Sequence, residues 1–284
     1  MAISRVGIVG SGIMGAGIAE VAARAGLDVV LRSRKQETAE AMLAGMEKGL
    51  AKQVDKGRLS EEDRDAILGR VTATHHIGDL ADCDLVIESV VEDLDVKRAL
   101  FAELDQVVKA DAILATNTST LPVVEMAVAT ERPERVVGVH FFNPAPAMSL
   151  VEVIAPLTAS DEAVEAVTEF ATACGKGPVR VEDRAGFIVN ALLFPYLNNA
   201  VRMLENGVAN REDIDAAMKG GCNFPMGPLA LLDLVGLDTS VAILDALYAE
   251  FADPNYSPAP VLRRMVAAGH LGRKSGQGFY DYRR

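Results

Sequence analysis

The sequence has no excess of positive charge. Its 28 lysine and arginine residues are outnumbered by 40 aspartate and glutamate residues, which gives a formal net charge of −12 at pH 7. Proteins that bind nucleic acids usually carry a basic patch or stripe, so we expect no nucleic-acid partner. An acidic surface mainly favours solubility.

The sequence is also poor in cysteine and lacks long apolar runs. Its cysteines, Cys83, Cys174 and Cys222, are scattered and form neither a CxxC pair nor a disulfide framework. This is typical of a reducing cytoplasm, and we expect no metal cofactor. No apolar run is long enough to span a bilayer, so no membrane partner is expected. The glycines of the apolar N-terminal stretch favour a place inside the fold over a signal peptide.

Glycine is concentrated in a turn near the N-terminus. The apolar run Val6–Val9 ends in Gly10-x-Gly12-x-x-Gly15. Gly10 permits the tight turn, Gly12 lets a pyrophosphate touch the backbone, and Gly15 lets the following helix pack close to the sheet. The N-terminus of that helix offers free N–H groups to phosphates. We therefore predict that this loop, with Ile13 and Met14, binds a dinucleotide.

The surroundings of the turn support this interpretation. A helix-compatible segment, residues 18–25, follows the glycines, and a second apolar strand is expected at Asp28–Leu31. A strand, the glycine pattern, a helix and a second strand in this order are the context that the motif requires. The alternative is a glycine-rich turn in another kind of α/β protein.

Short apolar strands and helical segments then alternate, which predicts a Rossmann-type α/β fold with a doubly wound sheet. A polar helical hairpin is inserted at about residues 37–70. The strands containing His140 and Glu152 are joined by a proline-rich connection too short for a helix. From about residue 185 only helical patterns remain, so we predict a dinucleotide-binding domain at residues 1–184 and an all-α domain at residues 185–284. A helical domain this small and apolar favours a homodimer, although its helices could pack only on the first domain.

The end of the second strand bears on the choice of cofactor. NAD-binding domains usually place an acidic residue there to bind the ribose 2′-hydroxyl, but this chain has Ser33 between Arg32 and Arg34. Guanidinium groups and a hydroxyl can bind a 2′-phosphate, whereas a carboxylate would repel it. The sequence therefore favours NADP over NAD. The alternative is that both arginines are ordinary surface charges and NAD binds.

One histidine and one glutamate are candidates for acid–base chemistry. His140 ends an apolar strand, and Glu152 lies within the next apolar strand, where a carboxylate is costly without a partner. If the strands return side by side, the carboxylate can hold one ring N–H and leave the other nitrogen to take a proton. Taken alone, a histidine in a strand and a glutamate in a strand are more often structural.

Three further groups of polar residues have both a functional and a structural interpretation. Ser119 follows a strand at the expected ligand edge of the sheet, but hydroxyl residues there can also cap a helix. Asn190 opens the helical domain and needs a polar partner if it is buried. Lys52 and Lys56 of the hairpin could contact phosphates or be ordinary exposed lysines.

The motifs together, in order along nearly the whole chain, resemble the 3-hydroxyacyl-CoA dehydrogenase family, and most closely its short bacterial 3-hydroxybutyryl-CoA form. They are the glycine loop, ESVVED at 88–93, NTS at 117–119, GVHFFNP at 138–144, VEVI at 151–154, GFIVN at 186–190, PMGP at 225–228 and GQGFY at 276–280. The family's usual acid is replaced by Ser33.

The resemblance implies a role for each matching residue. His140 would be the general base, Glu152 its partner, and Ser119 and Asn190 would bind the reacting oxygen and the thioester. The positions that match cofactor contacts near the nicotinamide are Glu92, Lys97, Asn143 and Lys274, besides Ser119. Lys56, with Lys52, falls where the CoA phosphates lie.

The expected activity is the reversible oxidation of a short-chain (S)-3-hydroxyacyl-CoA to the 3-oxoacyl-CoA, with an acyl-CoA as the small-molecule partner. The same chemistry on an acyl-carrier-protein thioester or a free hydroxy acid is an alternative. A non-catalytic nucleotide-binding protein is a second alternative, which the set of Ser119, His140, Glu152 and Asn190 argues against.

Overall fold

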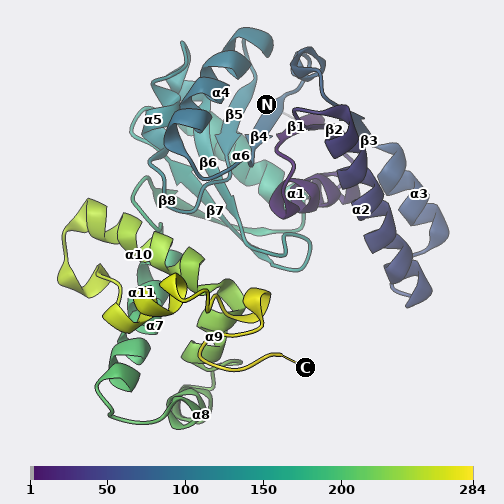
Figure 1. The fold of residues 1–284 in the computed structure, drawn as a ribbon. Helices are drawn as coiled ribbons and strands as arrows, with labels where there is room; N and C mark the ends of the chain where they lie inside the picture. Colours follow the sequence, from purple (N-terminus) through teal and green to yellow (C-terminus); the bar gives the residue numbers. More distant parts are fainter. Residues whose placement is uncertain (1–2, 284) are drawn as a thin grey trace. The chain divides into compact units, whose positions relative to one another are not determined.

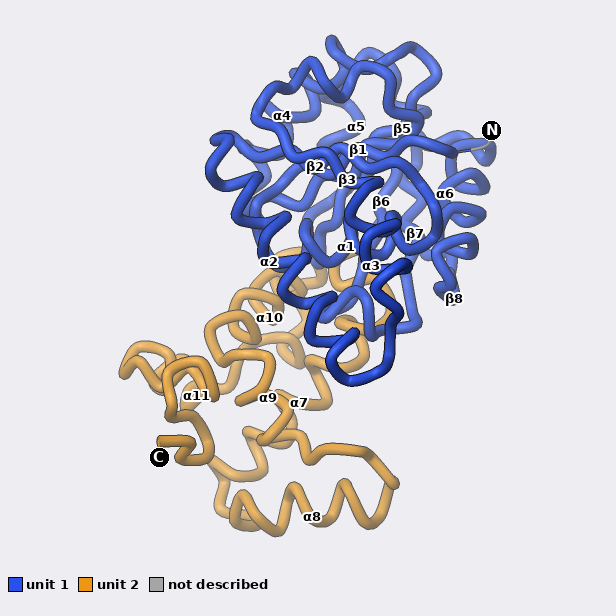
Figure 2. The backbone as a smooth tube through the Cα atoms, turned by 90° about the vertical axis from the view of Figure 1, so that its right-hand side faces the viewer, with its two compact units in different colours: residues 1–183 blue, residues 184–284 orange. Residues whose placement is uncertain are grey.

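The computed structural model describes residues 3–283, which form two compact units (Figure 1). The first unit comprises residues 1–183 and the second residues 184–284, as Figure 2 shows in two colours. Each unit has its own hydrophobic core.

The first unit contains an eight-stranded sheet with the strand order β3-β2-β1-β4-β5-β6-β7-β8. Neighbouring strands are parallel except β6 and β7, which are antiparallel. The strands are β1 (Arg5–Val9), β2 (Asp28–Arg32), β3 (Val71–Thr74), β4 (Leu85–Glu88), β5 (Ile113–Thr116), β6 (Val136–Phe141), β7 (Leu150–Ala155) and β8 (Gly177–Glu182). The order of the first six is that of a dinucleotide-binding fold, whose ligands bind beyond the carboxyl ends of the parallel strands.

Helices cover both faces of this sheet, which confirms the predicted doubly wound α/β class. They are α1 (Ile13–Arg24), α2 (Gln36–Asp55), α3 (Glu61–Gly69), α4 (Leu94–Val107), α5 (Val123–Ala127) and α6 (Asp161–Ala173). Alternate residues of the strands form one core with α1, α2 and α6. The other residues face α4 and α5, because successive side chains of a strand point to opposite faces. Short 3₁₀ turns lie at Ile77–Leu80 and Pro133–Arg135.

Helices α2 and α3 occupy the segment where the sequence indicates a hairpin. Met42, Met46 and Leu50 of α2 are buried on the sheet side. Gly57 adopts a positive φ of 65° just beyond α2 and ends that helix. Ser60 begins α3 by accepting a hydrogen bond from the backbone N–H of Asp63, which is an N-cap interaction.

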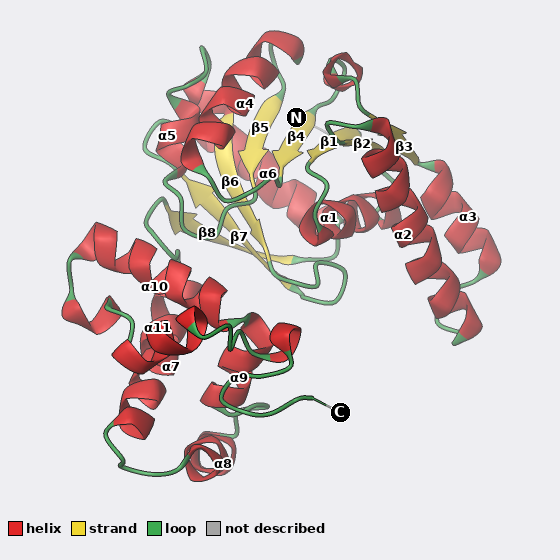
Figure 3. Ribbon diagram, in the orientation of Figure 1, coloured by secondary structure: helices red, strands yellow, loops and turns green. Residues whose placement is uncertain are grey.

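The second unit is helical, as Figure 3 shows by colour. Its helices are α7 (Val189–Glu205), α8 (Arg211–Cys222), α9 (Pro228–Val235), α10 (Leu237–Phe251) and α11 (Pro260–Ala267), with 3₁₀ turns at Pro254–Tyr256 and Arg273–Ser275. Apart from two isolated bridges, at Gly272–Gln277 and Gln277–Asp281, no strand pairing occurs among its described residues. The C-terminal segment is tied down by Asp233, which accepts hydrogen bonds from the N–H groups of Phe279 and Tyr280. Burial raises the pKa of Asp233 in spite of these bonds.

Candidate active site

The glycine loop has the geometry that its pattern predicts. Gly10 has a φ of 141°, and a Cβ there would lie 2.2 Å from the backbone oxygen of Ser89. A Cβ on Gly15 would lie 2.6 Å from the backbone oxygen of Gly10, so a side chain would push α1 away from the loop. No atom lies within 4 Å of the Cβ position of Gly12, which leaves the backbone open at the N-terminus of α1. Phosphate oxygens can be bound at such a helix start.

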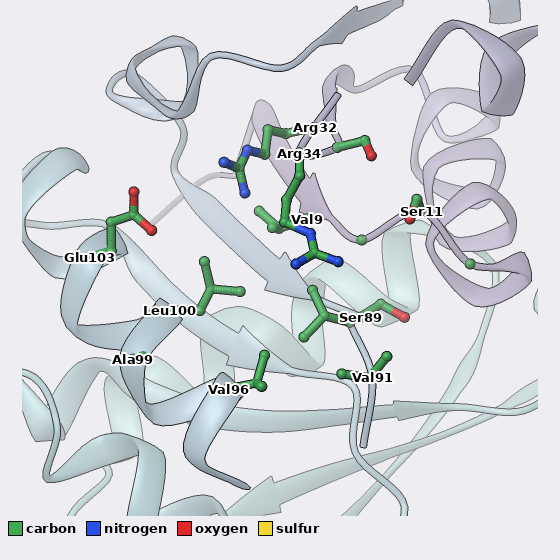
Figure 4. A pocket seen from close by; sticks show the side chains of 14 residues that line it. Val9, Ser11, Arg32, Arg34, Ser89, Val91, Val96, Ala99, Leu100 and Glu103 are labelled. Atoms are coloured by element: carbon green, nitrogen blue, oxygen red, sulfur yellow. The ribbon is translucent and has the colours of Figure 1, made fainter. Parts of the chain in front are cut away.

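A pocket of about 740 Å³ opens beside this loop. Its residues come from the glycine loop, the end of β2, the segment after β4 and one side of α4. Figure 4 shows Arg32 at the end of β2 and Arg34 just after it, reaching into the pocket opposite Val96 and Leu100 of α4. A cavity of this size and mixed polarity suits a nucleotide.

The arginines at this pocket carry unmatched charge. Neither Arg32 nor Arg34 forms an ion pair with another described residue, and the Nε of Arg32 is buried with no hydrogen-bond partner. Ser33 between them is nearly buried and donates its backbone N–H to the oxygen of Thr74. Glu103 of α4 also lines the pocket. A buried polar nitrogen without a partner indicates a place where a ligand oxygen can bind.

His140 and Glu152 form the predicted pair. They are directly opposite in the antiparallel register of β6 and β7, so their side chains lie on the same face of the sheet. The Nδ1 of His140 lies 2.7 Å from Oε2 of Glu152, and both residues are buried. Because an ionised carboxylate only accepts hydrogen bonds, Nδ1 carries the proton of a neutral His140 ring. The ring of His140 also packs against Phe142, with 4.5 Å between ring centroids.

Ser119 is placed through its backbone. Its N–H donates to Oε1 of Glu92 at 2.8 Å, and the hydroxyl of Thr118 donates to the same oxygen. The Ser119 hydroxyl has no hydrogen-bond partner in the described part of the chain. Thr118 also accepts hydrogen bonds from the N–H groups of Thr120 and Leu121. The turn-capping role therefore belongs to Thr118 and leaves the Ser119 hydroxyl available.

Asn117 links three neighbouring strands at this edge. Its backbone N–H donates to the backbone oxygen of Glu88 at the end of β4, and its amide nitrogen lies 3.3 Å from the Ser89 hydroxyl. Its amide oxygen accepts the N–H of Phe141, the residue after His140, at 2.9 Å. The backbone pairing of β5 with β6 ends at Thr116 and Gly138, so this side chain extends the contact between the two strands.

Lys97 is fully buried, and its ammonium pairs with Glu88. The Nζ of Lys97 lies 2.8 Å from both carboxylate oxygens of Glu88 and 3.5 Å from Oε2 of Glu92. Lys97 does not line the nucleotide pocket. The structure therefore brings Glu92, Lys97 and Ser119 together, as three neighbours in one network.

The remaining predicted residues lie elsewhere. Ile13 is exposed at the start of α1, and Met14 packs against the core of the first unit. Asn143 lies in the connection between β6 and β7. Lys52 and Lys56 are exposed on the last turn and C-cap of α2.

Two predicted residues belong to the second unit. Asn190 is buried in the first turn of α7. Lys274 forms an ion pair with Asp238, which lies in the first turn of α10.

Glu88, Thr116 and Asn117 are the network residues to which the sequence assigned no role. A carboxylate at the end of the apolar run Leu85–Ile87 requires a partner, and this is the argument that identified Glu152. Strand alternation places Glu88, Thr116, His140 and Glu152 on the same face, the one opposite the core of α1 and α6. That shared face was the available signal.

Among the described residues, no group of histidine, cysteine or acidic side chains is arranged to hold a metal ion.

The fold and the site together define a dinucleotide-binding α/β protein with a histidine–carboxylate pair at the ligand edge of its sheet. The family model for the 3-hydroxyacyl-CoA dehydrogenase NAD binding domain matches residues 5–184, and that for the C-terminal domain matches residues 186–282. The chain belongs to the 3-hydroxyacyl-CoA dehydrogenase family, as its motifs indicated, and the family's cofactor is a nicotinamide dinucleotide.

Proteins from several organisms are similar to this chain over nearly its full length. A 3-hydroxybutyryl-CoA dehydrogenase of Mycobacterium tuberculosis is 52% identical over 99% of both chains. The human mitochondrial hydroxyacyl-coenzyme A dehydrogenase is 42% identical over 99% of this chain and 92% of its own. The crystal structure of (S)-3-hydroxybutyryl-CoA dehydrogenase from Ralstonia eutropha superposes with a TM-score of 0.97 at 43% identity, covering 100% of both chains.

Proposed function

We propose that this protein interconverts a short-chain (S)-3-hydroxyacyl-CoA, typified by 3-hydroxybutyryl-CoA, and the 3-oxoacyl-CoA. The observation that carries the proposal is the hydrogen bond of 2.7 Å between His140 and Glu152 at the ligand edge of the sheet. The names of the relatives support the substrate class.

The chemistry follows from the proton on Nδ1 of His140. Because the proton on Nδ1 is hydrogen-bonded to Glu152, the lone pair of the neutral ring is on Nε2, which can accept the proton of the substrate's 3-hydroxyl group. Glu152 then stabilises the imidazolium that forms. In the reverse direction the imidazolium returns the proton to the developing alkoxide. Hydride transfer is the chemistry that a nicotinamide cofactor would supply at this site when bound.

Other residues take the positioning roles that the family resemblance implies. We assign Ser119 and Asn190 to the reacting oxygen and the thioester. We assign the nicotinamide end to Glu92, Lys97, Asn143 and Lys274. The free Ser119 hydroxyl and its backbone link to Glu92 support this placement.

Lys52 and Lys56 are assigned to the CoA phosphates. A second pocket of about 380 Å³ lies between the glycine loop, the residues Met42, Gly45 and Met46 of α2, and Pro144–Pro146. It is largely apolar and lies along the helix that carries these lysines. This supports an acyl-CoA over a free hydroxy acid, which has no phosphate to bind.

NADP is the proposed cofactor in preference to NAD. The unpaired charges of Arg32 and Arg34 and the orphaned Nε of Arg32 at the pocket support a 2′-phosphate. Ser33 replaces the acid that would repel this phosphate.

Steady-state reduction of acetoacetyl-CoA with NADPH and with NADH tests both proposals. We expect turnover with a higher kcat/KM for NADPH. A large preference for NADH would refute the cofactor assignment alone. No turnover with either cofactor would refute the activity, and the carrier-protein thioester and the free acid, assayed alongside, would identify the alternative substrates.

We also propose a homodimer in the cytoplasm. Exposed apolar side chains on α7 support self-association. The cysteines are unpaired, which suits a reducing compartment. Among residues 3–283, no helix is both long and apolar enough to cross a membrane.

A further inference from the structure

One buried ammonium serves two carboxylates at the edge of the sheet. Lys97 and Glu88 both have side chains that are 0% exposed, whereas the Glu92 side chain is 39% exposed. A buried charge is costly unless it is paired, so Lys97 depends on Glu88 for its place in the fold. The distance of 3.5 Å to Glu92 brings the same ammonium to a carboxylate that is partly exposed.

Glu92 is the outer member of this arrangement. Its Oε1 accepts the N–H of Ser119 at 2.8 Å and the hydroxyl of Thr118 at 2.5 Å, while Oε2 faces Lys97. The position of the carboxylate therefore decides where the turn that carries Ser119 lies. A continuous path of polar contacts runs from Glu88 through Lys97 and Glu92 to Ser119.

Glu88 has no capacity left to bind a ligand. Its Oε1 accepts the N–H of Val90 at 2.5 Å, its Oε2 accepts the Thr116 hydroxyl at 2.7 Å, and both oxygens bind Lys97. Its influence on the reaction has to pass through these neighbours.

We propose that Glu88 is a positioning residue for the nicotinamide end of the site, acting through Lys97 on Glu92 and Ser119. The inference rests on the proposed function for the identity of the cofactor and of the reacting groups. Without the charge of Glu88, the ammonium of Lys97 has only Glu92 as an anionic partner among its contacts. It is then drawn toward Glu92 and competes with the N–H of Ser119 for that carboxylate.

The variant Glu88→Gln isolates this effect. The glutamine oxygen can still accept the N–H of Val90, and its amide can still bond Thr116, so the main loss is the charge that Lys97 requires. We expect kcat for acetoacetyl-CoA reduction to fall by about 10- to 100-fold, because small displacements of reacting groups cost up to about 10²-fold.

Binding measurements separate positioning from general damage. The affinity for NADPH, measured by its fluorescence, should weaken about tenfold, since the nicotinamide half loses its ordered partners. The affinity for 2′,5′-ADP, which occupies only the adenine half beside Arg32 and Arg34, should change less than about twofold. If Glu88 had a purely structural role, its replacement would weaken the binding of both ligands to a similar extent.

Thr116→Val is the matched control, because it removes one hydrogen bond from the Glu88 carboxylate and leaves its charge. It should lower thermal stability while kcat and the ratio of the two affinities stay near the wild-type values.

The double variant Glu88→Gln/Lys97→Met removes both charges and refills the space. It should recover stability without recovering kcat, because Glu92 has then lost the ammonium beside its Oε2.

The possible outcomes test the positioning role of Glu88 separately from the proposed enzymatic activity. A Glu88→Gln protein with near-normal kcat and NADPH affinity would overturn the positioning role, and so would a double variant that regains kcat with its stability. If Glu88→Gln does not fold, the double variant alone decides by the same criterion. If the wild-type protein fails to reduce acetoacetyl-CoA, the proposed function fails, and the two affinities still test Glu88.

Discussion

The chemistry assigned to His140 depends on a single atom, the Nε2 of its ring. We predict that His140→Gln lowers the turnover of acetoacetyl-CoA by about 10²- to 10⁴-fold, which is the usual contribution of a general acid–base. Affinity for NADPH should be unchanged, because the nucleotide pocket does not include His140. Stopped-flow kinetics and fluorescence titration measure the two quantities.

His75→Gln is the control for this substitution. His75 is exposed in the same unit and contacts Gln36, away from the pair. Its replacement should leave turnover unaltered. Near-normal turnover in His140→Gln, with NADPH bound, would contradict the assignment of the base.

The proposed choice of NADP depends in part on Ser33. We predict that Ser33→Asp lowers kcat/KM for NADPH by at least about tenfold, because a carboxylate beside a 2′-phosphate costs at least about 1.4 kcal/mol in binding. The value for NADH should change much less. Ser160→Asp is the control, since Ser160 caps α6 and an aspartate caps equally well. An equal loss with both cofactors would show that Ser33 does not face the 2′ position.

For single residues, the sequence predicted those contacts in which the two partners lie on adjacent strands. His140 and Glu152 were found because a short connection brings two apolar strands back together. The contact between Glu88 and Lys97 could not be predicted in this way. It depends on how α4 lies across the sheet, and the lysine belongs to a helix with many charged residues, where exposure is the ordinary expectation.

Helices and strands could be predicted from the sequence where nearby side chains determine their position. Ser60 and the acids that follow it mark the start of α3, and the apolar runs mark the buried strands. The side chain of Asn117 could not be placed from the sequence. It bonds the N–H of Phe141 at the point where the backbone pairing of β5 and β6 ends, and that point depends on the register of two separate strands.

One carboxylate joins the starts of two central strands. Asp84, just before β4, accepts hydrogen bonds from the backbone N–H groups of Ser4 and Arg5, where β1 begins. Burial opposes its ionisation, but the hydrogen bonds from Lys109, Ser4 and Arg5 outweigh burial and hold the pKa of Asp84 well below its usual value. The ionised form therefore stabilises the pairing of β1 with β4.

We predict that Asp84→Asn lowers the free energy of unfolding by about 1–3 kcal/mol at pH 7. A lowered folded-state pKa contributes stability that is fully present above the unfolded value of about 4 and is lost as the pH falls toward the folded value. The difference between variant and wild type should therefore shrink below about pH 4. Urea unfolding at several pH values measures it.

Asp82→Asn is the matched control, because Asp82 is exposed two residues earlier. It should change the unfolding free energy by less than about 0.5 kcal/mol. Equal effects of the two substitutions at pH 7, or a difference for Asp84→Asn that stays constant down to pH 3, would contradict the role assigned to Asp84.

At the scale of the whole molecule, the change from alternating strands and helices to helices alone indicated two parts. The structure divides into compact units at residues 183 and 184. The sequence pattern carries this signal because each unit needs its own apolar core, and apolar residues recur at different spacings in strands and in helices. Composition could not identify which apolar residues of the second unit stay exposed, because that depends on how its five α-helices pack together.

Helix α7 keeps large apolar side chains exposed on one of its faces. Leu192 is 71% and Met203 45% exposed, and their spacing of 11 residues, close to three full turns, puts them on the same side. Tyr196, at i+4 from Leu192, lies along the same stripe and is half-buried. An apolar stripe of this kind marks a surface for association, which favours a second copy of the chain as its partner in the proposed homodimer.

We therefore predict that light scattering gives the mass of a dimer for the wild-type protein and that of a monomer for Leu192→Lys/Met203→Lys. Charged ammonium groups on both sides of a symmetric contact would repel and would have to lose their water. Leu157→Lys is the control, because Leu157 is 98% exposed but lies in the first unit, and its replacement should leave the dimer intact. A monomeric wild-type protein would contradict self-association. A double variant that remains dimeric would exclude this face of α7 as the contact.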